Sequence, residues 1–551
     1  MAFSPSVQVC LAFAVVCALV PCAHSVGVSS ATELINVFKN LQGDFVDTEI
    51  ELLADLNFSF SGLSLPLGVD SQGNCVPFNG TLHGNGHNIS SLVMNVPTTI
   101  GSKYKHAGLF CSLGGGARIE NLLIDSSCSF SGYNAGALSP VVTGSITVVN
   151  VINRASISAT AEAGGFIGRL YELLNTDITI VVTDCVNDGN VVGGSSVGGF
   201  IGYIACGGKL VVSNFTNNGE IGGGKTGGNI GGFAGYVQDI KEASVLNYSN
   251  NGFVSGSSSV GGVIGLLKDV PETEFSGISN VGNITGDYDI GGFIGNVDAT
   301  TSFNLSLSNC INSGNVTADS YAAGFVGVVF SPRPPNTVTF SIVNGANTGA
   351  VMANNGKACG IFCVGMVETV FSSVRNSINK GDVSGNPVYG IADNITLASN
   401  VVSMGDITVL ETSYTFWKLS SDVSLFYGKK DQCVSCTGAT LFTYNANTGF
   451  YEVDGSDDYV HNRLNKEAEV QQYGMMWSKE LQLVEPFDLP SSSEQPVPSA
   501  SSSTSSSTSS EQPVPSSSTS ASSPVHSDSG AAVHSVCPLL LVLALVAVAL
   551  L

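Results

Sequence analysis

The sequence has few charged residues and very few basic ones. Only 11% of its 551 residues are charged, and 20 Lys and Arg stand against 43 Asp and Glu, which gives a formal net charge of -23. Such a chain would repel a phosphate backbone, so we expect no nucleic-acid partner. The composition also excludes an all-helical fold, because 65 Gly residues with abundant Asn, Ser, Val and Ile favour short strands separated by tight turns.

The N-terminus has an apolar run without a Lys or Arg before it. Residues 7–20 read VQVCLAFAVVCALV, and the small residues Ala23 and Ser25 follow. This order predicts a signal peptide over residues 1–25 that is cleaved after Ser25. The alternative is a buried N-terminal strand or helix.

The C-terminus ends in a second apolar run that is short for a membrane span. Residues 537–551 are apolar without a basic flank, whereas a spanning helix needs about 20 such residues. Small residues precede the run, so we predict a GPI attachment signal over 529–551, with the lipid on Ser529 and with Ser527 and Gly530 as rival sites. A short tail-anchor is the alternative. The Ser-, Thr- and Pro-rich residues 490–528 predict an extended, O-glycosylated stalk.

The cysteines and the N-x-S/T sequons agree with export through the secretory pathway. Of 14 Cys, ten lie outside the two end signals, so disulfides are expected. Cys433 and Cys436 form a CxxC pair for which we favour a local disulfide over a metal half-site or a redox dithiol, and we interpret Cys359 and Cys363 in the same way. Nine N-x-S/T sequons are glycosylation candidates: Asn57, Asn79, Asn88, Asn214, Asn247, Asn283, Asn304, Asn315 and Asn394.

An internal repeat predicts the fold. Blocks resembling Gly-Gly-Phe-Ile-Gly recur ten times, and from the second glycine of the first (Gly108) to that of the last (Gly390) nine intervals span 282 residues, about 31 residues each. An Asn- and Gly-rich element, such as SNFTNNGEIGG over 213–223, precedes each block. Each repeat therefore offers about three short strands, which predicts an all-β, right-handed parallel β-helix of about ten rungs.

Equivalent positions of the repeat predict the interior. The Phe position should form an internal ladder, and the position four residues later should share its face. Turn asparagines should stack as amide ladders, and the glycine pair should allow positive φ at a corner. The Phe-position residues are Phe166, Phe200, Phe233, Val263, Phe293 and Phe325, and the later ones are Leu170, Ile204, Val237, Leu267, Val297 and Val329.

The repeats have different segments on either side. Ser30 and Glu33 form a capping box that opens an amphipathic helix, ATELINVFKNL, and residues 26–60 are predicted as an N-terminal cap of the β-helix over 61–410. Residues 411–489 break the repeat and contain a predicted helix over 462–477. We interpret them as a C-terminal cap, with an independent small domain as the alternative.

The segment FNGTLHGNGHNISSLVM over 78–94, followed by the GGFIG blocks, resembles the GLUG-motif β-helix proteins. The resemblance covers about residues 45–410. It implies a surface protein of the kind found in bacteria and protists, including IgA-peptidase-type and adhesin-like architectures, in which the repeat itself has no known catalytic residues.

Few residues suggest chemistry. On one strand Asp287 and Asp289 would lie about 6.6 Å apart, within the range of glycosidase carboxylates, although a surface turn is the alternative. His83 and His87 flank a Gly-Asn-Gly turn without a third ligand, so no metal is expected. The glycine strings match neither a nucleotide fingerprint nor a calcium repeat, so no cofactor is expected. Tyr203 and Tyr236, on outward positions of adjacent rungs, are candidate sugar-stacking residues.

These observations favour a non-enzymatic protein on the outer face of the plasma membrane that acts in adhesion, in recognition or as a coat component. Its expected partners are glycans or proteins of a host or neighbouring cell, and the membrane itself through the GPI lipid. The alternatives are a surface polysaccharide lyase or glycoside hydrolase of the β-helix type, and a purely structural coat without a ligand.

Overall fold

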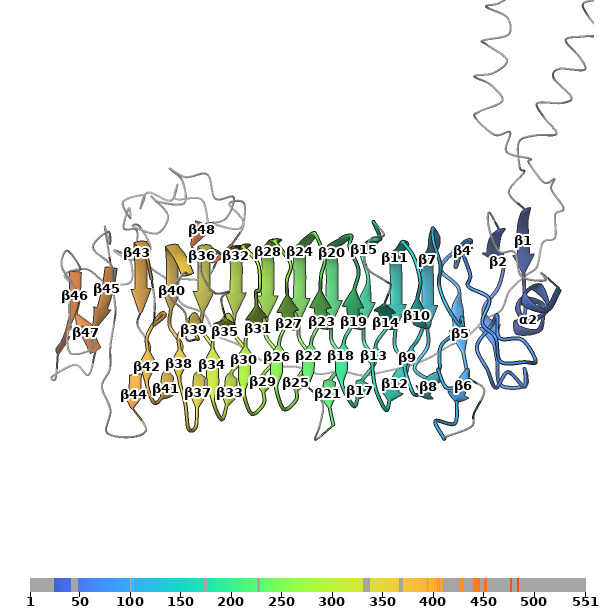
Figure 1. Ribbon diagram of the computed structural model, residues 1–551, viewed down its shortest axis with the longest axis horizontal. Helices are drawn as coiled ribbons and strands as arrows, with labels where there is room; N and C mark the ends of the chain where they lie inside the picture. Colours follow the sequence, from blue (N-terminus) through green and yellow to red (C-terminus); the bar gives the residue numbers. More distant parts are fainter. Residues whose placement is uncertain are drawn as a thin grey trace, which may run out of the picture. The chain divides into compact units, whose positions relative to one another are not determined.

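The computed structural model describes residues 24–409 except 41–47, 100, 101, 103, 172–176, 225–227, 331–336, 366–369, 394, 404 and 406, together with short strands between residues 426 and 484. The described chain is a parallel β-helix of about ten coils with one helix, α2 (Ala31–Asn40). The coils follow one another in chain order along its length (Figure 1). The predicted all-β solenoid is confirmed.

Each complete coil contains strands of four parallel sheets, which we number I to IV in the order in which the chain visits them. The sequence predicted three strands per coil. The difference lies in the Gly-Gly-Phe block: Gly232 and Phe233 form a bend between β22 (Asn229–Gly231) and β23 (Ala234–Gln238), so that the predicted third strand is two strands.

The strands of each sheet have the following bounds. Sheet I contains β1 (His24–Val28), β2 (Thr48–Leu52), β3 (Leu56–Asn57), β4 (Thr81–His83), β5 (Asn88–Ser90), β7 (Ala117–Ile124), β11 (Ile146–Asn153), β15 (Thr179–Thr183), β16 (Val186–Asn187), β20 (Lys209–Asn217), β24 (Glu242–Asn250), β28 (Glu272–Asn280), β32 (Phe303–Asn312), β36 (Val338–Asn347), β40 (Val370–Asn379), β43 (Leu397–Ser403), β45 (Phe426–Lys429), β46 (Thr440–Asn445) and β47 (Phe450–Glu452). Sheet II contains β6 (Val93–Asn95), β8 (Ser129–Gly132), β12 (Ser156–Ala159), β17 (Val191–Gly193), β21 (Ile221–Gly223), β25 (Val254–Ser255), β29 (Ile284–Thr285), β33 (Val316–Ala318), β37 (Val351–Ala353), β41 (Val383–Gly385) and β44 (Ile407–Val409). Sheet III contains β9 (Ala135–Gly136), β13 (Ala163–Gly164), β18 (Ser196–Gly198), β22, β26 (Ser259–Gly261), β30 (Asp289–Gly291), β34 (Tyr321–Ala323), β38 (Ala358–Cys359) and β42 (Val388–Tyr389). Sheet IV contains β10 (Ser139–Val142), β14 (Ile167–Tyr171), β19 (Ile201–Ala205), β23, β27 (Ile264–Lys268), β31 (Ile294–Asp298), β35 (Val326–Phe330) and β39 (Phe362–Val364).

Side chains from all four sheets fill the interior. The predicted Phe ladder is confirmed: all six positions are fully buried, and the rings of Phe200 and Phe233 stack with centroids 5.3 Å apart. The second predicted column, from Leu170 to Val329, is also buried. Because one coil cannot enclose its own apolar side chains, the stacking of coils both buries this core and pairs the backbone.

A ladder of asparagines at the end of each sheet I strand was also predicted, and it is confirmed. Each amide nitrogen except that of Asn379 donates to the amide oxygen one coil further on, as from Asn250 to Asn280 at 2.7 Å, and most also donate to a glycine carbonyl two residues ahead. The ladder satisfies polar groups that are fully buried. Its members are Asn153, Asn187, Asn217, Asn250, Asn280, Asn312, Asn347 and Asn379.

The prediction that the glycine pair takes positive φ is wrong. Positive φ occurs instead in the middle of the sheet I strands, mostly at asparagines such as Asn214 (φ 54°) and Asn247 (φ 52°), which tolerate this conformation better than most residues. The glycine pair is needed for space. A Cβ on Gly198 would lie 2.1 Å from the carbonyl oxygen of Ile201, and one on Gly199 would lie 2.1 Å from that of Gly232.

The N-terminal cap agrees with its prediction. Helix α2 begins with the expected capping box: Ser30 Oγ accepts a hydrogen bond from the Glu33 amide at 3.2 Å, and the Glu33 carboxylate accepts one from the Ser29 amide at 2.7 Å. Leu34, Ile35 and Phe38 bury the apolar side of the helix. Strand β1 begins at His24, so the signal boundary after Ser25, which stays a prediction, falls inside a strand paired with β2.

The predicted C-terminal cap lies largely outside the described residues. The helix expected over 462–477 is wrong at its end, because Met476 and Trp477 form β48 (Met476–Trp477), which pairs antiparallel with β49 (Leu483–Val484). Its other residues lie outside the described part of the chain.

Two disulfides are present among the described cysteines. Cys359 pairs with Cys363, as predicted for this local pair, and Cys75 pairs with Cys111 from the next coil. Cys128, Cys185 and Cys310 carry free, buried thiols, and Cys206 is also buried. Cys433 and Cys436 lie outside the described residues.

Candidate functional site

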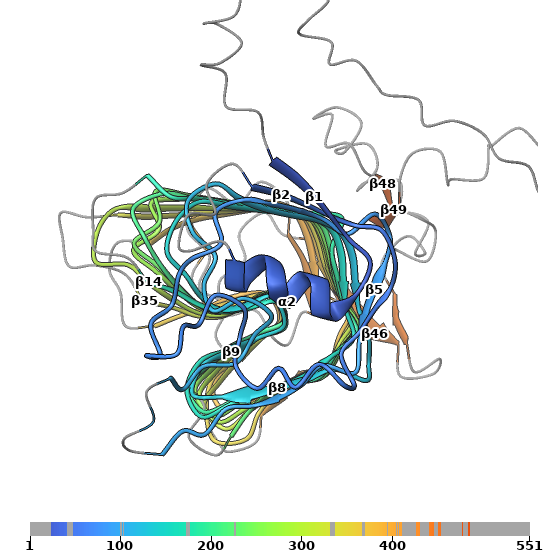
Figure 2. The same cartoon turned by 90° about the vertical axis from the view of Figure 1, so that its right-hand side faces the viewer.

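The candidate site is the outer surface of the bend between sheets III and IV. Seen down the long axis, the chain turns inward between β9 and β14 (Figure 2). Outward-facing residues of the two sheets, seven positions apart in sequence, therefore face each other. We call this surface the inner bend. On sheet III it comprises Glu162, Ser196, Asn229, Ser259, Asp289 and Tyr321, and on sheet IV Arg169, Tyr203, Tyr236, Leu266, Asn296 and Val328.

Contacts between the two sheets hold the bend at both ends. Arg169 Nη1 lies 4.0 Å from Glu162 Oε2, and Asn296 Nδ2 donates to Asp289 Oδ2 at 2.6 Å. Toward the C-terminal end the outward side chains are buried by one another: Asn296 is 8% exposed and Val328 is fully buried.

The middle of the inner bend presents aromatic rings opposite small polar groups. Tyr203 and Tyr236 pair on adjacent strands, with ring centroids 5.1 Å apart in an edge-to-face arrangement. Ser196 and Asn229 stand opposite them on sheet III, where Asn229 is partly exposed and Ser196 is buried. Both tyrosines are half-buried, and burial raises the pKa of Tyr236, so its hydroxyl stays protonated. This combination suits a ligand with apolar faces and hydroxyl edges.

One carboxyl group in the bend is unusually basic. Burial raises the pKa of Asp289 to about 6, and the hydrogen bond from Asn296 opposes this shift only in part. No Lys, Arg or His among the described residues pairs with this carboxyl group. Asp289 is thus a carboxyl group that changes charge near pH 6.

The C-terminal end of the inner bend is closed. The ammonium group of Lys357 bonds to the carboxylate of Asp393 and donates to the carbonyl oxygen of Val364 at 2.8 Å. It also lies 5.8 Å from the ring centre of Tyr321. Burial raises the pKa of Asp393, against the opposing effect of Lys357. The Cys359–Cys363 disulfide joins β38 and β39 in the same place, so an ion pair and a disulfide both hold this end.

The N-terminal end is open and contains a pocket of about 400 Å³. Tyr104, Lys105, His106, Val141 and Thr143 line it together with the Cys75–Cys111 disulfide. Val141 pairs with Arg169 on the next strand, so the pocket continues the inner bend. The His106 ring lies between Tyr104 and Tyr133, at centroid distances of 5.5 and 5.9 Å.

The two aspartates predicted as a catalytic pair do not share a strand. Asp289 lies in β30, but Asp287 lies in the preceding bend and is exposed. The spacing expected for two residues of one strand therefore does not apply, and the turn alternative describes Asp287. Only Asp289 belongs to the inner bend.

The two histidines considered as a metal pair each contact a carboxylate. His83 Nδ1 lies 2.7 Å from Glu120 Oε1, and His87 Nδ1 lies 3.1 Å from Asp55 Oδ1. Within the part of the chain that the structure describes, no group of three or more His, Cys, Asp or Glu residues is arranged to bind a metal ion.

The predicted sequons are distributed unevenly. Exposed ones lie on sheet I or on the turn that follows it, namely Asn57, Asn214, Asn247, Asn283, Asn304 and Asn315. Asn79 and Asn88 are half-buried, and the amide oxygen of each is enclosed. None of these eight lies on the inner bend. Asn394 and the lipidation candidate Ser529 are outside the described residues, and no helix among those described is long and apolar enough to cross a membrane.

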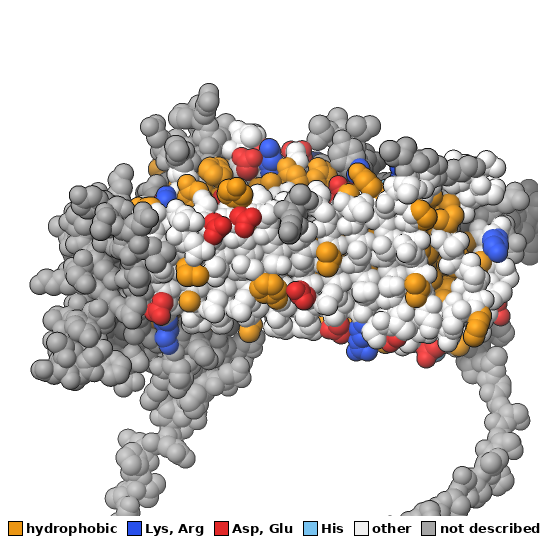
Figure 3. Space-filling model, turned by 90° about the horizontal axis from the view of Figure 1, so that it is seen from below, with side chains coloured by type: hydrophobic (Ala, Val, Ile, Leu, Met, Phe, Trp, Pro, Cys, Tyr) orange, Lys and Arg blue, Asp and Glu red, His pale blue; other side chains and the backbone are white. Residues whose placement is uncertain are grey.

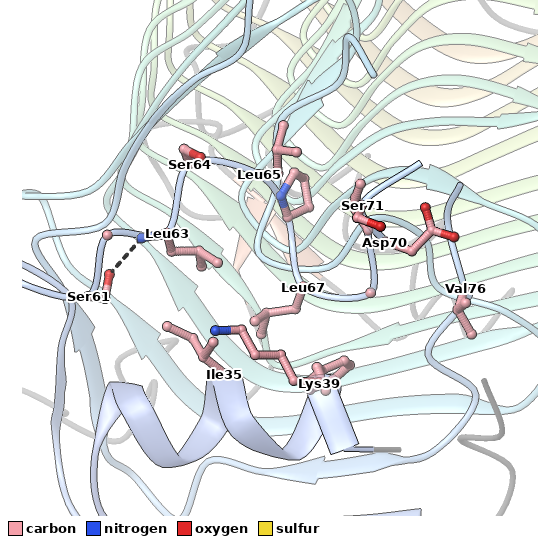
Figure 4. A pocket seen from close by; sticks show the side chains of 15 residues that line it. Ile35, Lys39, Ser61, Leu63, Ser64, Leu65, Leu67, Asp70, Ser71 and Val76 are labelled. Atoms are coloured by element: carbon pink, nitrogen blue, oxygen red, sulfur yellow. Dashed lines mark hydrogen bonds between the residues drawn. The ribbon is translucent and has the colours of Figure 1, made fainter. Parts of the chain in front are cut away.

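A second pocket, of about 680 Å³, lies beside helix α2 (Figure 4). Ile35 and Lys39 of the helix face a loop that carries Leu63, Leu65 and Leu67. The Asp70 carboxylate on its rim accepts hydrogen bonds at 2.8 Å from the backbone amides of Gln72 and Asn74, so it stabilises its own turn. Ser61, Ser64 and Ser71 are further polar residues of its lining.

The outer surface over sheet II has few charged side chains. In Figure 3 uncharged polar side chains and backbone dominate it, with scattered hydrophobic and few charged side chains. Its outward column includes Ser158, Ser255, Thr285, Thr317 and Ser384, interrupted by Val192 and Met352. By contrast, the inner bend combines aromatic, acidic and basic groups.

Sequence reasoning identified the sheet IV column but missed the sheet III column that faces it. The signal is present in the repeat: the outward residue of sheet III stands seven positions before that of sheet IV, as Ser196 before Tyr203 and Asp289 before Asn296. Recognising it requires knowing that the glycine pair bends the chain inward.

Comparisons with known proteins do not assign a family. No protein-family model matches the chain, and no curated protein matches it. Among solved structures, the crystal structure of a "putative immunoglobulin A1 protease from Bacteroides ovatus" is similar over 84% of this chain and 92% of that one, with 12% identity and a TM-score of 0.29. A likeness this weak carries no argument about activity.

Proposed function

We propose that this protein is a cell-surface recognition protein, attached through a GPI lipid, that binds linear glycans along the inner bend. The observation that carries the proposal is the pair of partly exposed rings of Tyr203 and Tyr236, which face the partly exposed Asn229 across the bend. Tyrosine rings present a flat apolar face, and the Asn229 amide beside them offers hydrogen bonds to sugar hydroxyls.

The repeat of the fold supports a linear ligand. Strands of one sheet are stacked about 4.8 Å apart, so successive coils present equivalent side chains at a spacing close to one sugar residue of an extended chain. From Arg169 to Asn296 the bend crosses five consecutive strands of sheet IV. Several weak contacts, made by different side chains on successive strands, then add up to useful affinity and specificity.

The placement of the sequons agrees with this use of the bend. If the chain passes through the secretory pathway, as its ends predict, glycans on the exposed sequons would cover sheet I and the turn after it. The inner bend would remain bare. The proposed partner on the bend is a glycan of a host or neighbouring cell.

Binding to a glycan panel tests the proposal. The ectodomain, residues 26–490, should bind a subset of linear oligosaccharides, and replacing both Tyr203 and Tyr236 by Ala should weaken binding at least tenfold, or about 1.4 kcal/mol. Tyr288→Ala is the matched control, because Tyr288 is 59% exposed on a turn outside the bend. Equal binding by the double variant and the wild type would refute the assignment.

The attachment is tested separately. Phosphatidylinositol-specific phospholipase C should release the protein from expressing cells, and Ser529→Leu combined with Ser527→Leu and Gly530→Leu should prevent attachment. Retention on the cells after phospholipase treatment would argue for a short tail-anchor.

A second candidate function is polysaccharide cleavage, and Asp289 is the residue that favours it. A carboxyl group with a pKa of about 6 can donate a proton to a leaving group in mildly acidic solution. Incubation with neutral and uronate-containing polysaccharides would show shortening of the chains if this function holds. Loss of that shortening in Asp289→Asn, with binding retained, would favour the enzyme over the recognition protein.

A further inference from the structure

The pocket at the N-terminal end of the inner bend is small, enclosed on one side and continuous with the row of tyrosines. Its volume of about 400 Å³ lies in the lower range of small-molecule sites. The Tyr104 hydroxyl donates to the carbonyl oxygen of Cys111 at 3.1 Å, and Cys111 is disulfide-bonded to Cys75, so this wall is held in place. The pocket can therefore receive the terminal residue of a chain that lies on Tyr203 and Tyr236.

The pocket has a local excess of positive charge in an acidic protein. Lys105 lines it, and no carboxylate among the described residues pairs with this ammonium group. Arg169 stands on the strand next to Val141, and its Nη1 lies 4.0 Å from Glu162 Oε2. Lys105 and Arg169 both act electrostatically on His106, in a chain with only 20 basic residues and a formal net charge of -23. Such a site selects an anionic group.

His106 supplies an unsatisfied polar atom at the same place. Its Nδ1 is buried and has no hydrogen-bond partner among the residues that the structure describes, although a buried polar atom normally has one. The pKa of His106 is lowered, first by burial and then by the positive charges of Arg169 and Lys105, so the ring is neutral at pH 7. A neutral imidazole can either donate to a carboxylate or accept from a sugar hydroxyl, according to its tautomer.

We propose that this pocket binds a uronic acid residue at the end of the glycan, with its carboxylate beside Lys105 and Arg169 and a polar atom bonded to His106. The ligand is thereby oriented, with its acidic end in the pocket and its neutral residues along the tyrosines. The closed C-terminal end, where Lys357 is already neutralised by Asp393, provides no second such site. This inference rests on the proposed glycan-binding function.

The test compares oligosaccharides that share a neutral backbone and differ only in one terminal residue. The three ligands end in a uronic acid, in its carboxyl-reduced neutral counterpart and in a sulfate ester, and binding to the ectodomain is measured by calorimetry. We expect the uronic acid form to bind at least tenfold more tightly than the reduced form. Equal affinities, or tighter binding of the sulfate ester, would overturn the proposal.

Single substitutions in the pocket show which residues cause the difference in affinity between the uronic acid form and the reduced form. Lys105→Gln should lower affinity for the uronic acid form at least fivefold and leave that for the reduced form unchanged, whereas His106→Gln should lower affinity for both forms. Lys209→Gln is the control, because it removes the same charge from an ion pair with Glu242 on sheet I. Equal effects of Lys105→Gln and Lys209→Gln would contradict the proposal. Failure of the proposed function is distinguishable, since then no oligosaccharide would bind in a manner that depends on Tyr203 and Tyr236.

Discussion

Asn296 donates a hydrogen bond of 2.6 Å to Asp289 from the opposite side of the inner bend, seven residues further along the chain. Glu162 and Arg169 repeat this relationship four coils earlier as an ion pair. The same spacing places Ser196 opposite Tyr203 and Asn229 opposite Tyr236. The seven-residue spacing in each coil therefore produces a surface with two facing sides. Polar contacts connect the two sides at both ends of this surface, and its centre is available to a ligand.

Asp289 should make stability depend on pH. Its pKa is about 6 in the folded protein against 3.8 in an unstructured chain, so the folded state binds the proton more tightly. Stability from this group is present at low pH and is lost as the pH rises from about 4 to above 6. Asp289→Asn should therefore stabilise the protein by about 1–2 kcal/mol at pH 7.5, after allowance for partial exposure, and should have no effect near pH 3.5. Denaturant unfolding at both pH values measures the difference; a variant that is less stable than the wild type at pH 7.5 would contradict the assigned shift.

The internal asparagine ladder should be sensitive to a single truncation. Asn250 is fully buried and donates to Gly252 and Asn280, so Asn250→Ala leaves several buried groups unpaired and should cost about 3 kcal/mol. Asn251→Ala removes an exposed amide that bonds to Asn218 at 2.8 Å, and should cost less than about 1 kcal/mol. Denaturant midpoints compare the two variants. Equal losses of stability would show that the buried ladder contributes no more than the exposed hydrogen bond.

The free thiols should be unreactive in the folded protein. Burial raises the pKa of Cys128 to about 11 and that of Cys185 and Cys310 to about 12, so little thiolate is present at pH 8. A maleimide should label these cysteines only after denaturation, whereas Cys75, Cys111, Cys359 and Cys363 should need reduction as well. Peptide mapping by mass spectrometry separates the two groups. Rapid labelling of Cys185 or Cys310 under native conditions would contradict their placement.

Glycan occupancy should follow exposure. In ectodomain secreted from eukaryotic cells we expect glycans at Asn247, Asn283 or Asn315, which are exposed, and none at Asn79 or Asn88, whose amide oxygens are enclosed. Asn283 and Asn315 belong to successive coils, so both should rarely be filled on one molecule. Mass spectrometry of glycopeptides before and after enzymatic deglycosylation measures occupancy. Full occupancy at Asn88 would be inconsistent with its environment.

The solenoid could be predicted from the sequence, because the features that specify it lie within one repeat or recur at the same position of each repeat. A repeat of about 31 residues places Phe200 and Phe233 in the same position of adjacent coils, and only stacking buries both. The asparagine ladder and the helical cap follow from the same repetition and from a capping box. These features depend on residues close in sequence or equivalent between repeats.

The candidate site was only half predictable. Tyr203 and Tyr236 were found because they share one position of the repeat, but Ser196 and Asn229 were not, because the inward direction of the bend depends on how closely Gly198 and Gly199 approach the next coil. The pocket at His106 depends on the Cys75–Cys111 disulfide, and pairing cannot be read from the order of cysteines. The aspartate pair failed as a prediction because the strand begins only at Asp289.

A length series of one glycan tests most directly whether the inner bend is the binding surface. Oligosaccharides of one to eight residues, taken from the tightest-binding family of the panel, are titrated into the ectodomain and into the Tyr203→Ala, Tyr236→Ala double variant. If the ligand lies along the bend with about one residue per coil, affinity should rise with each residue and level off near five. The double variant should lose the dependence on length beyond the first two residues. Affinity that is already maximal for one or two residues, or a series unchanged by the double substitution, would contradict the account.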